Sequence, residues 1–298
     1  MVLITGSTGF VGPYLIKELK SFGYQVTGTA VSGDTDYLLD ITDKKAVADL
    51  IRKLKPDLIV HLAGFSSVKE SFKSPELCMK VNVQGTGNLL DAVKEYVPVA
   101  RILIISSSEV YGNTKITPTK EIARLNPQNP YAESRVAQEE QVKNSGLNWI
   151  ISRSFNHIGP GQPQGFVASD FASQIAKINK DKQVSPFIYV GNLSAQRDFT
   201  DVRDVVAAYR LLLTKGKLHN IYNVCSGKAI RIENLLKKLL KFSKVKIEIK
   251  VDKDKLKPIE VKKTHGDNSK LKKELKWRPK VSIDKTLEDI YRYWLARV

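Results

Sequence analysis

The chain has 298 residues, a formal net charge of +17 at pH 7 and a pI of about 9.6. This length suits one large domain, or a domain with a smaller lobe, that folds without disulfides or metals. No apolar run reaches the roughly 20 residues of a membrane span, and no charged leader precedes the first strand. We therefore expect a cytoplasmic protein with no membrane partner, no metal site and two free thiols, Cys78 and Cys225.

The excess of lysine does not predict a nucleic-acid partner. A strongly basic chain can bind nucleic acid through a basic patch. Here the lysines are spread over predicted helices, gather in the last third of the chain and lack interleaved aromatic residues. A solvated basic surface is the better interpretation. Such a surface also attracts a doubly charged nucleotide diphosphate.

In the first half of the chain, short apolar runs alternate with amphipathic segments. The predicted strands cover residues 2–5, 25–30, 58–62, 102–106 and 149–152. The predicted helices between them cover residues 15–22, 44–54, 83–97 and 131–145. Nearly continuous Val, Ile and Leu strands separated by helices indicate a parallel sheet covered on both faces. The fold class is therefore α/β, a doubly wound Rossmann sheet with ligands at the carboxyl ends of its strands.

After Asn156 the alternation becomes less regular. The predicted elements there are a loop over 159–165, helices over 167–179, 202–214 and 283–296, and strands over 184–190 and 220–225. We predict a dinucleotide-binding domain over 1–155, to which the chain returns over 193–225. Residues 156–192 and 226–298 are predicted to form a smaller lobe that binds substrate.

A glycine-rich loop joins the first strand to the first helix. Gly6, Gly9 and Gly12 follow each other at three-residue intervals, and Pro13 lies in the first helical turn. Glycine permits a tight turn and lets a ligand approach the backbone amides at the positive helix N-terminus. Because the motif stands between a strand and a helix, it predicts a site for the pyrophosphate of a dinucleotide.

Tyr131 and Arg135 are four residues apart and share one face of a predicted helix. If that face turns toward the strand predicted over 102–106, the hydroxyl of Ser107 can reach the phenol. Reduction of a ketone needs a proton for the developing alkoxide, and a tyrosine with an ordinary pKa of ~10 exchanges its proton reluctantly at neutral pH. A neighbouring cation lowers the pKa of a phenol. The arrangement resembles the Ser…Tyr-x-x-x-Lys triad of a dehydrogenase family, and this resemblance implies that the three residues are catalytic.

The glycine spacing and the Ser…Tyr-x-x-x-Arg pattern resemble those of the extended short-chain dehydrogenases/reductases, in the NAD-dependent epimerase/dehydratase family. Relatives carry lysine where this chain has Arg135, and arginine keeps the charge but cannot shuttle a proton. The resemblance implies NADP or NAD; residues 29–32 contain neither an acid nor a base that would indicate which. The implied cofactor contacts are Gly6, Thr8, Gly9, Phe10, Val11, Gly12, Asp40, Ile41, Leu62, Ala63, Gly64, Asn82, Tyr131, Arg135 and His157.

The same resemblance implies a nucleotide-sugar substrate. Segments 155–174 and 190–204 are most similar to the branch that uses NAD(P)H to reduce GDP-4-keto-6-deoxy-D-mannose at C4 to GDP-D-rhamnose. The implied substrate contacts are Ser108, Asn156, Arg197, Arg231 and Lys257, where relatives usually have arginine at the last position. A homodimer through helices 83–97 and 131–145 is also implied.

Three alternative functions stay open at this point. In 4,6-dehydratases of the family, an acid at the position of Glu109 removes the C5 proton of the sugar, so Glu109 is a further candidate catalytic residue. A 4-epimerase would use the same site and recycle its cofactor. A protein that senses NAD(P) without turnover is the third alternative, and the replacement of lysine by Arg135 favours it.

Overall fold

The computed structural model describes residues 1–114, 116–255 and 261–298. Within this part, a seven-stranded sheet has the order β10-β6-β5-β4-β1-β2-β3, and all of its neighbouring strands are parallel. Its strands are β1 (Val2–Thr5), β2 (Val26–Ala30), β3 (Tyr37–Leu38), β4 (Leu58–His61), β5 (Arg101–Ser107), β6 (Asn148–Ser154) and β10 (Asn220–Val224). The strand order reverses beside β1, where doubly wound sheets bind their ligands.

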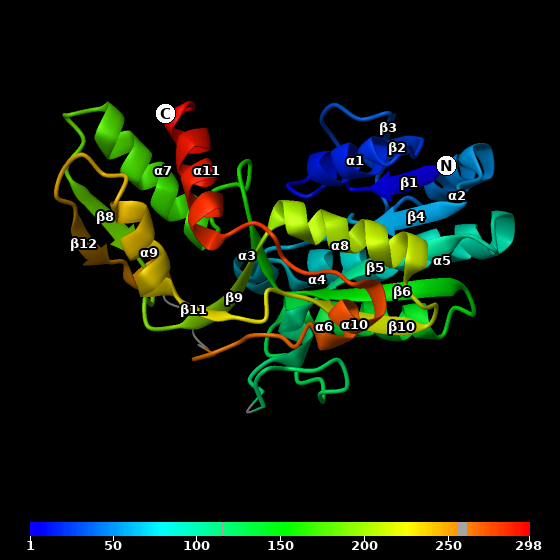
Figure 1. Cartoon of the computed structure of the whole chain (residues 1–298). Helices are drawn as coiled ribbons and strands as arrows, with labels where there is room; N and C mark the ends of the chain where they lie inside the picture. The colour runs from blue at the N-terminus through cyan, green and yellow to red at the C-terminus, as the bar shows by residue number, and fades with distance from the viewer. Residues whose placement is uncertain (115, 256–260) are drawn as a thin grey trace.

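Helices cover both faces of this sheet, as Figure 1 shows. On one face, α1 (Gly12–Ser21), α8 (Val202–Lys215) and α10 (Ser269–Leu275) bury apolar residues against the strands. On the other, α2 (Lys44–Leu54), α5 (Gly85–Tyr96) and α6 (Pro130–Lys143) do the same. The predicted doubly wound fold is confirmed.

Local signals fix the start of the helix that carries the candidate tyrosine. The side chain of Asn129 accepts a hydrogen bond from the amide of Ala132, and Pro130 occupies the first turn of α6. A capping asparagine satisfies an amide that the helix leaves unpaired, and proline costs nothing at that position. Tyr131 therefore stands at the first turn of α6, close to the carboxyl ends of the strands.

The helix predicted over 83–97 differs from the observed one at its start. Two short helices, α3 (Val68–Lys73) and α4 (Pro75–Met79), lead into a π-helical turn, η1 (Lys80–Gln84), and only then into α5. A π-helical turn inserts an extra residue and is common at functional sites. Here it carries Asn82.

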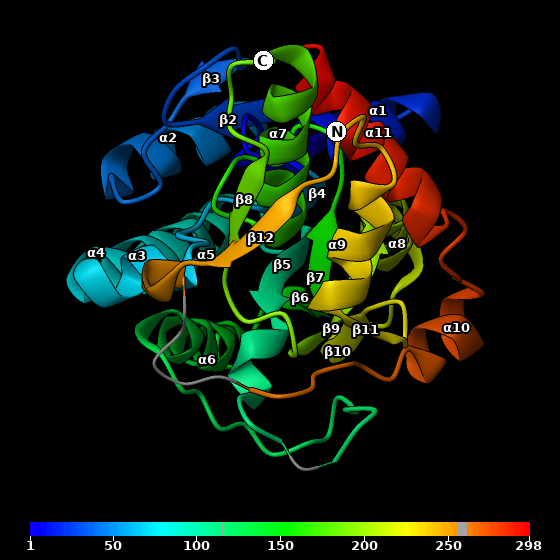
Figure 2. The same ribbon diagram turned by 90° about the vertical axis from the view of Figure 1, so that its left-hand side faces the viewer.

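A smaller lobe follows β6, at the left of Figure 1 and facing the viewer in Figure 2. Its strands are β7 (Asn156–Ile158), β9 (Gln196–Asp201) and β11 (Ala229–Arg231) in one sheet, with β8 (Phe187–Val190) and β12 (Glu248–Val251) in another. Its helices are α7 (Val167–Lys180), α9 (Ile232–Leu240) and α11 (Ile283–Leu295), with short 3-10 turns η2 (Ser108–Tyr111) and η3 (Lys253–Lys255) elsewhere. The three helices enclose a separate apolar core.

The returning segment predicted over 193–225 is divided between the two parts of the molecule. Helix α8 and strand β10 join the large sheet. Strand β9 instead pairs with β7 and β11 in the small sheet. The exact domain boundaries stay a prediction.

Both cysteines are buried free thiols. In the part of the chain that the structure describes, no helix is long and apolar enough to cross a membrane.

Candidate active site

The glycine-rich loop lies directly against the end of β4. Gly6 has a φ of +73°, and a Cβ on it would lie 2.6 Å from the amide nitrogen of Ala63. A side chain there would be strained and would push the loop away from the sheet. A Cβ on Gly9 would meet nothing closer than the carbonyl of Gly6 at 3.3 Å. No side chain caps α1, whose N-cap is Val11. The loop thus offers an open approach to an uncapped helix N-terminus, which suits a phosphate.

Thr8 and Phe10 connect the glycine-rich loop to neighbouring segments of the chain. The hydroxyl of Thr8 donates to the carbonyl of Ser32 over 3.0 Å, which ties the loop to the segment after β2. Phe10 stacks on His157 of β7 with the ring planes 7° apart and the centroids 6.1 Å apart. Burial and a hydrogen bond to a backbone carbonyl act on His157 in opposite senses, and burial prevails, lowering the pKa of the imidazole. The cofactor loop and the small lobe therefore meet through a neutral aromatic pair.

Further predicted cofactor residues line the carboxyl ends of β3 and β4. Asp40 is exposed and accepts two hydrogen bonds of 2.8 Å from Thr42, whereas Ile41 beside it is buried. The backbone of Leu62, Ala63 and Gly64 continues from β4, and the amide of Ala63 donates to the hydroxyl of Thr5.

Asn82 braces the segment after β4. Its Oδ1 accepts from the amide of Phe65 over 2.7 Å, and its Nδ2 donates to the carbonyl of Phe65 and to Ser134 Oγ on α6. The π-helical turn aims this fully buried amide between the two elements. It fixes the distance between the segment after β4 and α6.

The predicted catalytic residues lie on elements that pack together. Ser107 ends β5, and its Oγ accepts from the amide of Glu109 over 3.2 Å. Tyr131 and Arg135 lie on α6, which packs against β5 and η2. The guanidinium carbon of Arg135 is 5.2 Å from the centre of the Tyr131 ring. Within the described residues, the phenol oxygen of Tyr131 makes no hydrogen bond, and so it is available to a ligand.

Arg135 is held on two sides. Its Nη1 donates to Gln138 Oε1 over 2.9 Å and to the carbonyl of Ile105 over 3.2 Å. Its Nη2 donates to the carbonyl of Phe65 over 3.3 Å. A Cβ on Gly64 would lie 2.7 Å from Nη2, so the guanidinium needs a glycine there. Nε is buried and has no partner in the described part of the chain.

Glu109 lies near the start of α6, and its carboxylate already accepts a hydrogen bond from another side chain. It is half-buried in η2, the turn that Ser108 opens, and its Oε2 accepts from Asn129 Nδ2 over 3.2 Å. Asn129 is also the N-cap of α6. The carboxylate therefore links η2 to the start of the helix that carries Tyr131.

A buried ion pair below the site was not singled out in the sequence. Arg153 of β6 donates to Glu139 of α6 over 2.6 Å, both being at most 3% exposed, and Ser106 Oγ donates to the same carboxylate. The guanidinium of Arg153 also lies over the ring of Tyr111. Glu139 follows Arg135 by four residues, which was the available signal that it faces the strands.

The small sheet brings together several predicted substrate residues. Asn156 is exposed at the start of β7, and its Nδ2 donates to the carbonyl of Asp198 over 3.4 Å. Arg197 on β9 donates to the carbonyls of Gln196 and Val261. Arg231 on β11 is half exposed, with Glu233 Oε2 3.8 Å away. Because β9 pairs with both β7 and β11, these three residues share one sheet. Lys257 lies outside the described residues.

Asp198 stabilises this arrangement. It is fully buried and accepts hydrogen bonds from Ser226 and from the amides of Gly227 and Gly266. Burial outweighs these bonds and raises the pKa of the carboxyl. Asp198 therefore connects β9 to the loop after β10.

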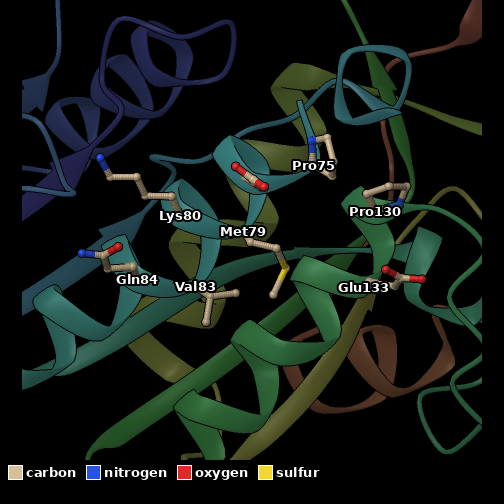
Figure 3. A pocket seen from close by; sticks show the side chains of 8 residues that line it. Pro75, Met79, Lys80, Val83, Gln84, Pro130 and Glu133 are labelled. Carbon is tan, nitrogen blue, oxygen red and sulfur yellow. The ribbon is translucent and has the colours of Figure 1, made fainter. Parts of the chain in front are cut away.

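An open groove of about 620 Å³ lies on the outer surface beside α6. Pro75, Met79 and Val83 line one side, and Pro130 and Glu133 line the other, as Figure 3 shows. Nearby Phe72 and Leu77 are 52% and 49% exposed. In the described ranges, by contrast, no cluster of three His, Cys, Asp or Glu side chains could hold a metal ion.

Comparisons with known proteins identify the family. The family model described as GDP-mannose 4,6 dehydratase matches residues 3–290. The chain is 34% identical to the GDP-6-deoxy-D-mannose reductase of Pseudomonas aeruginosa over 100% of this chain and 98% of that protein. It is 29% identical to human GDP-mannose 4,6 dehydratase, covering 97% and 90% of the two chains.

Solved structures agree with these matches. RMD from Pseudomonas aeruginosa, complexed with NADPH, superposes with a TM-score of 0.89 at 34% identity, covering 100% of this chain and 99% of that one. UDP-glucose 4-epimerase from Thermus thermophilus, in complex with NAD, superposes with a TM-score of 0.87 at 26% identity, covering 100% and 99%. The predicted family is confirmed: the chain belongs to the GDP-mannose 4,6-dehydratase family, within the extended short-chain dehydrogenases/reductases.

Proposed function

We propose that this protein uses NADPH or NADH to reduce the C4 ketone of GDP-4-keto-6-deoxy-D-mannose, forming GDP-D-rhamnose. The observation that carries the proposal is the buried Tyr131–Arg135 pair on α6, which packs against β5, the strand that ends at Ser107. The 34% identity to a GDP-6-deoxy-D-mannose reductase along the whole chain supports this substrate class.

The site residues fit a dinucleotide. In the loop over 6–12, Gly9 has only the carbonyl of Gly6 near its Cβ position, and the helix N-terminus that follows is uncapped, which suits the pyrophosphate. The unpaired buried Nε of Arg135 has a hydrogen bond to give, which a ribose hydroxyl can accept. Asp40 and Ile41 would hold the adenine end, and the wall over 62–64 braced by Asn82 would hold the middle.

Reduced nicotinamide supplies a hydride when it is bound. Tyr131 gives its phenolic proton to the sugar oxygen at C4, and Ser107 donates a hydrogen bond to the same oxygen. Arg135 stabilises the phenolate that results, because its charge lies close to the ring. At 8% exposure, Tyr131 is largely screened from water, which strengthens that interaction.

The small lobe supplies the substrate contacts in this proposal. Asn156, Arg197, Arg231 and Lys257 hold the nucleotide diphosphate, and Ser108 contacts the sugar. Arginine suits this role because its planar fork presents paired donors to phosphate oxygens. In this proposal residues 156–192 and 226–298 form the substrate lobe, except for α10, which packs on the large sheet. Residues 1–155, with α8 and β10 from the returning segment, form the dinucleotide domain.

We also propose a homodimer through the groove beside α6. Phe72 of α3 and Leu77 and Met79 of α4 are exposed apolar side chains, and Met79 lines the groove. Exposed apolar surface marks interfaces when it gathers in one place. The interface would then include α4, which lies outside the predicted ranges 83–97 and 131–145. Light scattering should give twice the chain mass, and Met79→Glu should shift the protein toward the monomer.

The experiment for the activity supplies GDP-mannose, with and without an added 4,6-dehydratase, and follows the absorbance of NAD(P)H. The reductase oxidises the cofactor only when the dehydratase provides the keto sugar. Conversion of GDP-mannose without the added enzyme would instead identify a dehydratase, and C4 epimerisation without net oxidation would identify an epimerase. Binding of NADPH without any turnover would identify a sensing protein.

Glu109 separates the reductase from the dehydratase most directly. Its hydrogen bond to the α6 cap favours a structural contribution over proton abstraction at C5. Glu109→Gln retains the shape and the ability to accept from Asn129. The variant should therefore keep reductase activity within about threefold, whereas a dehydratase would lose roughly 10²-fold or more on losing its base.

A further inference from the structure

A fully buried glutamine lies behind the guanidinium of Arg135. Gln138 is 0% exposed and follows Arg135 by three residues, on the same face of α6. Arginine has only donors, so the oxygen of the Gln138 amide must face it, and Nη1 donates to that oxygen over 2.9 Å. The amide nitrogen then faces Thr86 on α5, where it donates to Oγ1 over 2.7 Å. One side chain thus ties the guanidinium to the neighbouring helix.

The far side of this contact is also fully determined. Thr86 Oγ1 donates its only hydrogen to the carbonyl of Asn82 over 2.7 Å. In its other hydrogen bonds this oxygen must therefore be the acceptor. His61 Nε2 lies 3.0 Å away and therefore carries the hydrogen, and His61 Nδ1 accepts from the hydroxyl of Thr5. Every polar side-chain atom of Gln138, Thr86, His61 and Thr5 has a partner. A satisfied buried network of this kind is rigid, and it cannot shift without leaving a group unpaired.

The chemistry of the glutamine suits a guanidinium that must keep its charge. A carboxylate at 138 would pair with Arg135 and neutralise it, whereas an amide accepts the hydrogen bond and stays neutral. The adjacent acid, Glu139, is paired with Arg153 instead. Arginine is longer than the family's lysine and carries more donors, so it needs an additional acceptor to be held in one orientation.

We propose that Gln138 is a positioning residue that lets Arg135 stand in for the family lysine. It holds Nη1, leaves Nε free for the cofactor and leaves the positive charge available to the phenol. The carbonyls of Ile105 and Phe65 hold the remaining donors, and Gly64 gives the guanidinium its space. This inference rests on the proposed NAD(P)H-dependent function, but its test measures cofactor binding separately from turnover.

The test replaces Gln138 by methionine, which has a similar length and volume but offers Arg135 no strong acceptor. Binding of NADPH to the full-length protein is followed by fluorescence titration. Gln138→Met should weaken NADPH binding by roughly tenfold, a size consistent with the loss of one charge-assisted hydrogen bond. Gln141→Met on the same helix is the matched control, because Gln141 packs against Gly87 and does not contact Arg135. Its dissociation constant should stay within about twofold of the parent.

A double-mutant cycle with Arg135→Met shows whether Gln138 acts through the guanidinium. If it does, the double variant binds NADPH as weakly as Arg135→Met alone, because no guanidinium is left to position. Equal weakening by Gln138→Met in both backgrounds would overturn the inference, as would equal weakening by Gln141→Met. If NADPH binds but the keto sugar is not reduced, the proposed function fails while the cycle still decides the contribution of Gln138.

Discussion

The guanidinium of Arg135 lies 5.2 Å from the centre of the Tyr131 ring, one helical turn along α6. Both side chains are buried, at 5% and 8% exposure, so the field of the cation acts on the phenol with little screening by water. Arg135, which replaces the family's lysine, thus keeps a positive charge close to the phenol. Substitutions at this pair and in the residues around it should therefore have measurable effects.

Replacing Tyr131 by phenylalanine removes the proposed proton donor and keeps the ring. Turnover should fall by ~10²-fold or more. The dissociation constant for NADPH should change little, because Arg135 keeps its contacts to Gln138 and to the carbonyls of Ile105 and Phe65. Steady-state kinetics and a binding titration measure the two effects, and a fully active variant contradicts the proposed chemistry.

Gly64→Ala should displace the guanidinium. The new Cβ would lie 2.7 Å from Arg135 Nη2 and 2.9 Å from Asn82 Oδ1, both too close for real contacts. NADPH binding should weaken roughly tenfold, which corresponds to about 1.4 kcal/mol and lies within the usual cost of overpacking. Lysine lacks the terminal fork, so the same substitution should matter less in an Arg135→Lys protein. An equal effect in both backgrounds would mean that the clash is with Asn82.

Glu139→Gln should destabilise the fold. It removes one partner of a fully buried ion pair and leaves the Arg153 guanidinium without a counter-charge. The free energy of unfolding should fall by about 3 kcal/mol, measured by urea unfolding. Glu140→Gln is the control on the same helix: its carboxylate is exposed and pairs with Lys143 at the surface, so the variant should stay within about 0.5 kcal/mol of the parent.

His61 should make stability depend on pH. Burial, with a smaller contribution from the charge of Arg135, lowers the pKa of His61 to about 3. In the unfolded chain this histidine takes up a proton below about pH 6.5, so the unfolded state binds more protons and stability is lost as the pH falls toward 3. Between pH 7 and pH 5 the parent should lose about 2 kcal/mol more than His61→Gln, as urea unfolding at the two pH values would show. Parallel pH curves would contradict this.

The sequence determined the features that local patterns carry. A strand, a glycine-rich loop and a helix adjoin one another in the chain, so the cofactor loop could be located without the fold. Tyr131 and Arg135 could be paired because helix periodicity puts positions four apart on one face. The alternation of strands rich in Val, Ile and Leu with amphipathic helices likewise predicted the doubly wound sheet.

Tertiary structure alone decided the contacts between residues distant in the sequence. Gln138 meets Thr86 across 52 positions, and Arg135 meets Phe65 across 70. Such contacts also determine the π-helical turn that orients Asn82 and the pairing of β9 with β7 in the small sheet. Periodicity reports which face of an element is buried, but not which partner covers it, because that choice depends on how the separate elements pack. The sequence therefore located the proposed reacting groups, and the packing of α5, α6 and the segment after β4 determined how the Arg135 guanidinium is held.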